Sequence, residues 1–202
     1  MIKKYLLNLT LSAGISALAL SASADVNFSK KLEAVKNSQE SVFKKLDDVY
    51  NLVEAEYQSI DGTLSPEMAG LRTAAIAKAG TIAREIFNNS GSNDATDKSK
   101  LKEVEDHIQF VRCYSKDLHN YNKLVSALQK DDISAVQAMM GESVMCINLS
   151  GVGKVTGIDG TTITLKTVAG NTPATYQWGV KIPVGTHVIF GAKGQNPVHL
   201  GQ

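Results

Sequence analysis

Cysteine, proline and tryptophan are scarce in this chain, whose 202 residues include two cysteines, four prolines and one tryptophan. Apolar runs are scarce too, because no stretch after residue 24 approaches the roughly 20 residues that a membrane-spanning helix needs. Neither sign of charge dominates, since 21 basic and 20 acidic residues leave a net charge of +1. This balance argues against a general affinity for nucleic acid or for anionic lipid. We therefore expect neither nucleic-acid binding nor an integral membrane span in the mature protein.

Motifs for catalysis and for metal binding are also absent. The chain has no Cys-x-x-Cys, no His-Glu-x-x-His and no Gly-x-Ser-x-Gly, and these spacings are typical of redox, zinc and acyl-transfer sites. The stretch GVGKVTG over residues 151–157 lacks the spacing of a phosphate-binding loop, and no helical pattern follows it. His107 and His119 are too far apart on a helix to share a ligand. We expect a protein that is not an enzyme, with no catalytic residue, no metal and no cofactor.

The first 24 residues have the pattern of a cleavable signal peptide. Two lysines precede an uncharged, mostly apolar stretch over residues 5–20. The sequence Ala-Ser-Ala at 22–24 then supplies the small residues that signal peptidases select. We predict cleavage after Ala24 and a mature chain of residues 25–202, located in the periplasm or secreted.

The two cysteines, Cys113 and Cys146, both lie in the predicted mature chain. In an exported protein two cysteines favour a disulfide, because the compartment is oxidising. Their spacing matches no zinc motif. We predict a structural disulfide that ties the end of the helical region back to the middle of its third long helix.

Apolar residues predict a continuous helix over residues 28–60. Steps of three and four residues separate them, and this spacing keeps one stripe of a helix facing a partner. The stripe consists of Phe28, Leu32, Val35, Val42, Leu46, Val49, Val53 and Ile60, with Gln39 as a polar break. It can pack inside the chain, against another protein or against a second copy, and the sequence leaves these alternatives open.

Three more helices are predicted before residue 150. Ser65 can cap the second, and Pro66 suits its first position. The third runs over residues 98–129 with the same three-four spacing, and Asp132 caps a short fourth helix over residues 133–140.

After residue 150 the apolar residues alternate with a period of two, which is typical of strands. Val155, Ile163 and Leu165 fall on one face if residues 159–161 form a three-residue hairpin loop. Several short strands within about 50 residues bury little as a flat sheet. We therefore predict a small β-barrel of SH3-like or OB-like type.

Two pairs of residues are candidates for contact with a ligand or partner. Tyr176 and Trp178 share one face of a predicted strand, where they can either stack on a ligand or fill the barrel core. Met139 and Met140 form a soft apolar patch near Cys146, or else part of the core.

The predicted fold class is α+β, with an antiparallel bundle of three long helices and one short helix over residues 25–149 and the barrel over residues 150–202. The function that fits is an exported, non-enzymatic interaction or scaffold protein, an accessory subunit of a bacterial envelope assembly such as a secretion or pilus system. Its partners would be other envelope proteins, or a second copy bound through the helical stripe. The alternative is a binding module whose barrel recognises a glycan or another small polymer.

Overall fold

The computed structural model describes residues 26–60, 65–167, 170–175, 182–191 and 197–200. Helices come first along the chain and antiparallel strands follow, so the α+β class is confirmed. The predicted signal peptide lies outside the described residues and stays a prediction. No helix in the described ranges is long and apolar enough to cross a membrane.

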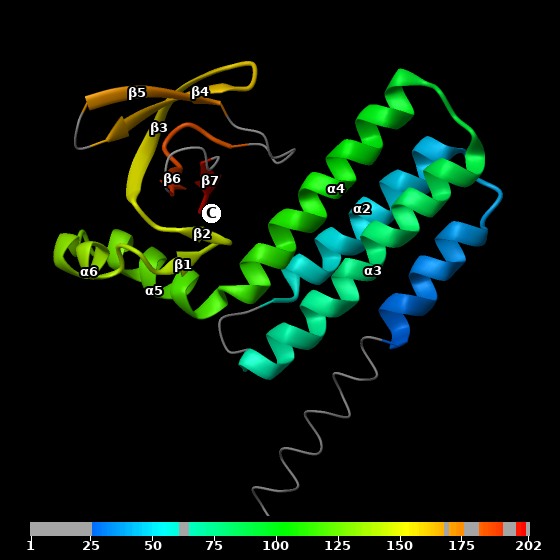
Figure 1. Ribbon diagram of the computed structural model, residues 1–202, viewed down its shortest axis with the longest axis horizontal. Helices are drawn as coiled ribbons and strands as arrows, with labels where there is room; N and C mark the ends of the chain where they lie inside the picture. The colour runs from blue at the N-terminus through cyan, green and yellow to red at the C-terminus, as the bar shows by residue number, and fades with distance from the viewer. Residues whose placement is uncertain (1–25, 61–64, 168–169, 176–181, 192–196, 201–202) are drawn as a thin grey trace, which may run out of the picture.

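The helical part contains a short helix over residues 26–37 and five further helices. Of these, α2, α3 and α4 pack against one another along their lengths, while α5 and α6 lead away toward the strands (Figure 1). Their bounds are α2 Val42–Gln58, α3 Pro66–Ser90, α4 Ala95–Lys116, α5 Leu118–Gln129 and α6 Ile133–Ala138.

Two predicted long helices are each broken once. The prediction of one helix over residues 28–60 is wrong, because residues 38–40 bend and Ser41 starts α2 by accepting a hydrogen bond from the N–H of Lys44. The prediction of one helix over residues 98–129 is wrong as well, because Asp117 separates α4 from α5. Ser41 caps α2 in the usual way, whereas the Asp117 side chain makes no capping bond and accepts from Ser143 and Cys146 instead.

The predicted apolar stripe is confirmed as core, and it is buried within this chain. Six of its eight members are buried, and the other two, Val35 and Val42, pack against the same cluster. The buried six are Phe28, Leu32, Leu46, Val49, Val53 and Ile60.

The strands form a two-stranded sheet and a five-stranded sheet. The larger sheet is antiparallel throughout, in the order β5-β4-β3-β6-β7. It is open between β5 and β7 in the part of the chain that is described, so a closed barrel is not confirmed. The bounds are β1 Ser143–Val144, β2 Ile147–Asn148, β3 Gly151–Asp159, β4 Thr162–Thr167, β5 Gly170–Thr175, β6 His187–Phe190 and β7 Val198–His199.

The β3–β4 hairpin confirms the predicted face and corrects the predicted loop. Val155, Ile163 and Leu165 are all buried in a small cluster of their own. The loop has two residues rather than three, because Asp159 pairs directly with Thr162.

The main apolar core crosses the predicted boundary between residues 149 and 150. One cluster of buried residues extends from Phe28 in the first helix to Leu200 after the last strand. The ring of Phe110 on α4 stacks on that of His199 on β7, with centroids 4.6 Å apart. The helices and the last two strands therefore share a core, and a division into two domains stays a prediction.

The disulfide between Cys113 and Cys146 is confirmed. It joins α4 to the β1–β2 hairpin, an element that the sequence did not predict. The hairpin turn has two non-glycine residues in the left-handed region, Met145 and Cys146, with φ of 53° and 62°. The Asp117 carboxylate accepts hydrogen bonds there, from the Cys146 N–H at 2.7 Å and the Ser143 hydroxyl at 2.9 Å. The disulfide fits an extracellular or periplasmic location.

Candidate binding groove

A cavity of about 680 Å³ lies between α5–α6 and the sheet, and we call it the α6 groove. One wall comes from the end of α5, the following turn and α6, and the other comes from β3, β4 and β6. Its size is typical of sites that bind a drug-sized ligand or a few residues of a peptide.

The helical wall of the α6 groove exposes large apolar side chains. Ile133 is 62% exposed and Met140 is 41% exposed, and both line the groove. Val136 lines it too, but is buried beneath them. Exposed apolar side chains that gather at a cavity mark a surface that a ligand or partner can cover.

Three basic side chains form a row across the sheet wall, and we call it the basic row. Lys154 on β3 lies directly opposite Lys166 on β4 and directly opposite His187 on β6. Residues paired in this way point to the same face of a sheet. All three line the α6 groove. Within the described residues neither lysine forms an ion pair with a carboxylate.

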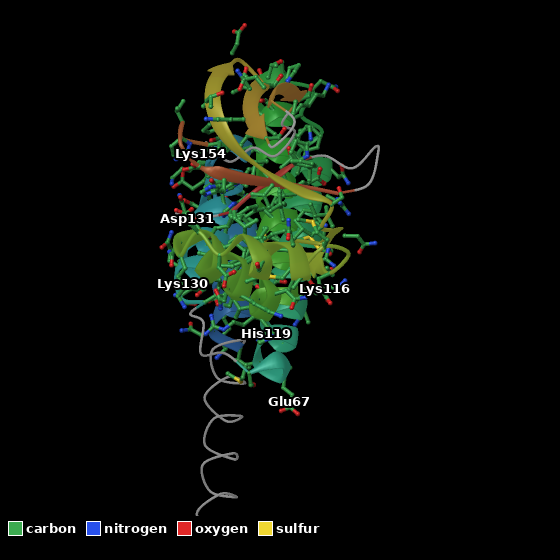
Figure 2. The ribbon with its side chains drawn as sticks, turned by 90° about the vertical axis from the view of Figure 1, so that its left-hand side faces the viewer. Glu67, Lys116, His119, Lys130, Asp131 and Lys154 are labelled. Carbon is green, nitrogen blue, oxygen red and sulfur yellow. A yellow bond between two sulfur atoms is a disulfide. The ribbon has the colours of Figure 1, made fainter. Side chains whose placement is uncertain are left out.

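An acidic turn faces the basic row. Asp131, in the turn between α5 and α6, lies on the same face of the molecule as Lys154 (Figure 2). Burial lowers the pKa of His187, the charge of Lys154 lowers it further, and Asp131 opposes both effects. The carboxylate of the neighbouring Asp132 is used at the start of α6, where it accepts the N–H of Ala135.

The ring of Phe190 on β6 lies against the backbone of β3 at Gly151. A Cβ added at its strand partner Gly151 would be 2.2 Å from the Phe190 ring, so only glycine leaves the ring room in this position. Both residues line the groove. Glycine at 151 therefore fixes the shape of this wall.

A second cavity of about 410 Å³ adjoins the α6 groove, and we call it the turn pocket. The two cavities share Leu128 and His187 as lining residues. The turn pocket is bounded on its far side by the Pro183–Thr186 turn. A ligand longer than one cavity can therefore cross from one to the other over these two side chains.

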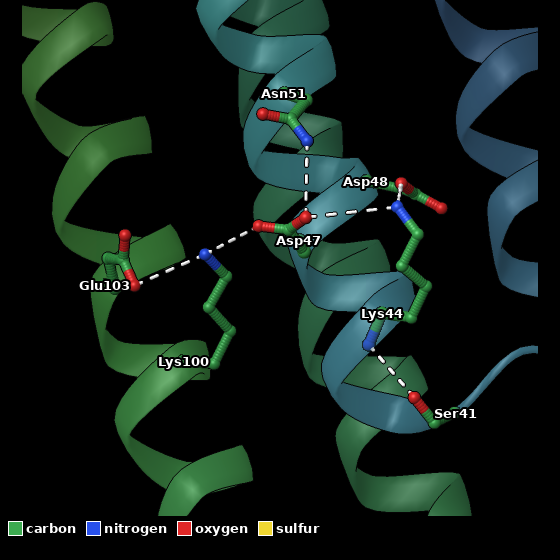
Figure 3. Close-up of polar contacts among 7 residues, drawn as sticks. All are labelled: Ser41, Lys44, Asp47, Asp48, Asn51, Lys100 and Glu103. Atoms are coloured by element: carbon green, nitrogen blue, oxygen red, sulfur yellow. Dashed lines mark hydrogen bonds and ion pairs between the residues drawn. The ribbon is translucent and has the colours of Figure 1, made fainter.

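A polar cluster between α2 and α4 centres on the nearly buried ammonium of Lys100. The ammonium of Lys100 lies 2.9 Å from Asp47 and 3.3 Å from Glu103 (Figure 3). It also lies over the ring of Tyr50, 4.9 Å from its centroid. The hydrogen bond from Lys100 holds the pKa of Asp47 below its usual value. The charge of Lys100 is paired with carboxylates on both α2 and α4, so the cluster holds these two helices together.

His107 extends this cluster into the core. It is 2% exposed and stacks on Tyr50 with ring centroids 4.3 Å apart. Its Nε2 lies 3.0 Å from Oε2 of Glu54, although neither ring nitrogen meets hydrogen-bond geometry. Burial lowers the pKa of His107, against the charge of Glu54. The described ranges contain no group of three or more histidine, cysteine or acidic residues that could hold a metal ion.

The structure separates the two predicted methionine contacts. Met140 lines the α6 groove, whereas Met139 is fully buried in the core. Tyr176 and Trp178 lie outside the described residues, so their role in ligand binding stays a prediction. The basic row was not predicted, because its residues are distant in sequence and meet only through strand register.

Comparison with known proteins finds no relative. No protein-family model matches the sequence, no curated protein is significantly similar to it, and no solved structure matches the fold. The functional interpretation therefore depends on the residues of this chain.

Proposed function

We propose that this chain is a non-enzymatic interaction protein of the cell envelope, an accessory subunit that holds a partner protein in the α6 groove. In this proposal the helices form a bundle that serves as a rigid body. The C-terminal strands, curled into a small barrel, provide the second wall of the groove. The signal peptide over residues 1–24 would export the chain to the compartment of its partner.

The observation that carries this proposal is the composition of the two groove walls. Cations in adjacent positions repel one another on the sheet wall, and large apolar side chains stay in water on the helical wall. Both features are unfavourable in a protein that acts alone, and both favour contact with another molecule. The disulfide supports the envelope location.

Site-specific cross-linking in intact cells tests the proposal. A photo-reactive benzoylphenylalanine replaces Met140 in the α6 groove, and in a control strain it replaces Leu71, which is 40% exposed on α3 and lies outside the groove. We expect position 140 to cross-link an envelope protein that mass spectrometry identifies reproducibly, and position 71 to give no such product. Equal products from both positions, or none from position 140, would contradict the proposal.

A further inference from the structure

We propose that the occupant of the α6 groove is an extended, acidic and apolar segment of the partner protein. A carboxylate of the segment contacts Lys154 and Lys166, and two apolar side chains enter the α6 groove and the turn pocket. This inference rests on the proposed function and adds the chemistry of the partner to it.

The carboxylate follows from the basic row. Like charges directly opposite each other on adjacent strands are unfavourable, yet Lys154 and Lys166 occupy such positions and neither has a carboxylate partner within the described residues. Residues 151–202 contain four lysines and a single aspartate, so the sheet itself supplies little negative charge. A carboxylate placed between the two ammonium groups would interact with both at once.

The acidic turn opposite the basic row determines which wall of the α6 groove a carboxylate of the segment contacts. Asp131 is the acidic residue whose charge acts on His187, and it repels an approaching anion from the helical wall. A carboxylate is therefore favoured at Lys154 and Lys166, away from Asp131. The helical wall instead offers Ile133 and Met140, which match an apolar side chain.

The extended conformation follows from the two adjoining cavities. Alternate side chains of a strand point the same way, so residues two apart in a segment can enter neighbouring pockets. The α6 groove and the turn pocket are neighbours of this kind, since Leu128 and His187 separate them. A segment with two apolar side chains at alternate positions and an acidic residue close by fits both cavities and the basic row.

Peptide selection on the whole protein tests this inference. The disulfide-bonded chain over residues 25–202 is immobilised, and a random dodecapeptide library displayed on phage is selected against it at low salt. We expect enrichment of segments with apolar residues at alternate positions next to Asp or Glu. The dissociation constant of an enriched peptide labelled with fluorescein is then measured by fluorescence anisotropy.

A pair of charge reversals locates the site. In K154E/K166E the enriched peptide should bind at least tenfold more weakly. The control K116E/K123E changes the net charge equally at two exposed lysines outside both cavities, and it should change the dissociation constant less than twofold. Equal weakening in both double variants would overturn the inference, because it would show a general charge effect.

Two other outcomes also overturn it. Enriched peptides that lack acidic residues would show that binding needs no carboxylate at Lys154 and Lys166. Dodecanoate that binds in the groove while no peptide is enriched would show that the site takes a small amphipathic acid. If position 140 still cross-links an envelope protein in either case, the proposed function stands and only the inference about the segment fails.

Discussion

Lys100 lies between α2 and α4 with two carboxylates within 3.3 Å of its ammonium, whereas Lys154 lies on the sheet opposite another lysine and beside a histidine. The side chain of Lys100 is 9% exposed and that of Lys154 lines an open groove. Lys100 is paired with carboxylates of the same chain, whereas Lys154 and Lys166 have no carboxylate partner among the described residues.

The charge of Lys100 stabilises the packing of two helices, whereas the charge of Lys154 is available for contact with a ligand. A buried cation costs free energy unless it is paired, so partners for Lys100 must come from the same chain. An exposed cation keeps its hydration, so the repulsion between Lys154 and Lys166 costs less than an unpaired Lys100 would, and a ligand carboxylate can relieve it. The contrast is what makes the α6 groove, and not the polar cluster, the candidate site.

The largest expected effect comes from removing the disulfide that ties α4 to the β1–β2 hairpin, where the strand region begins. We expect C113A/C146A to lower the free energy of unfolding by about 3–4 kcal/mol, because the bond closes a loop with a sequence separation of 33. Urea denaturation followed by circular dichroism at 222 nm measures the change. A loss below about 1 kcal/mol would mean that the shared core alone holds the regions together. A second transition would show that they unfold separately.

A smaller effect is expected from acidification at the contact between the regions. Burial lowers the pKa of His199 from 6.5 to about 4. Between these values the unfolded chain binds a proton that the folded chain does not. Stability is therefore full above pH 6.5 and falls as pH decreases toward 4, with about 2 kcal/mol lost by pH 5.

His199→Gln should remove that share of the pH dependence when urea denaturation is compared at pH 7 and pH 5. His119→Gln is the matched control, because His119 is an exposed histidine on α5. An unchanged pH dependence in the His199 variant would show that the imidazole is not held neutral against Phe110.

The smallest effect tests the lysine comparison itself. We expect Lys100→Met to cost about 1–2 kcal/mol, since it removes the cation that Asp47 and Glu103 share across the two helices. Lys154→Met should change stability by less than about 0.5 kcal/mol, because no described ion pair is lost and repulsion from Lys166 is relieved. Thermal denaturation of both variants measures the difference. Equal losses would remove the distinction between the two regions.

The helical core could be predicted from the sequence, as could the helix starts at Ser65 and Asp132, whereas the two breaks inside predicted helices could not. The three-four spacing of apolar residues depends only on helix geometry, so it identified buried positions such as Leu46 and Val53. The break at Asp117 involves Ser143 and Cys146, which donate hydrogen bonds to its carboxylate only after the chain has folded back by more than 25 residues. No local pattern carries that information.

The basic row of the candidate site depends on a single irregularity of the sheet, a β-bulge in β3. A regular β3–β4 hairpin would continue the pairing of Gly157 with Thr164 and place Lys166 opposite Val155. A β-bulge between Val155 and Gly157 shifts the register by one residue, and Lys166 then lies opposite Lys154. Because a shift of one residue changes which side chains share a face, counting back from the observed two-residue turn without the bulge would miss the pairing of Lys154 with Lys166.

The apolar cluster that contains both Phe28 and Leu200 has a consequence for the order of folding. Neither the early helices nor the strands can complete this core until the segment around Leu200 is available. A chain emerging from a ribosome or from a translocation pore would hold its helices with one side of Phe110 uncovered until the ring of His199 is released. Completion of the core therefore requires contacts between residues far apart in sequence, which form late.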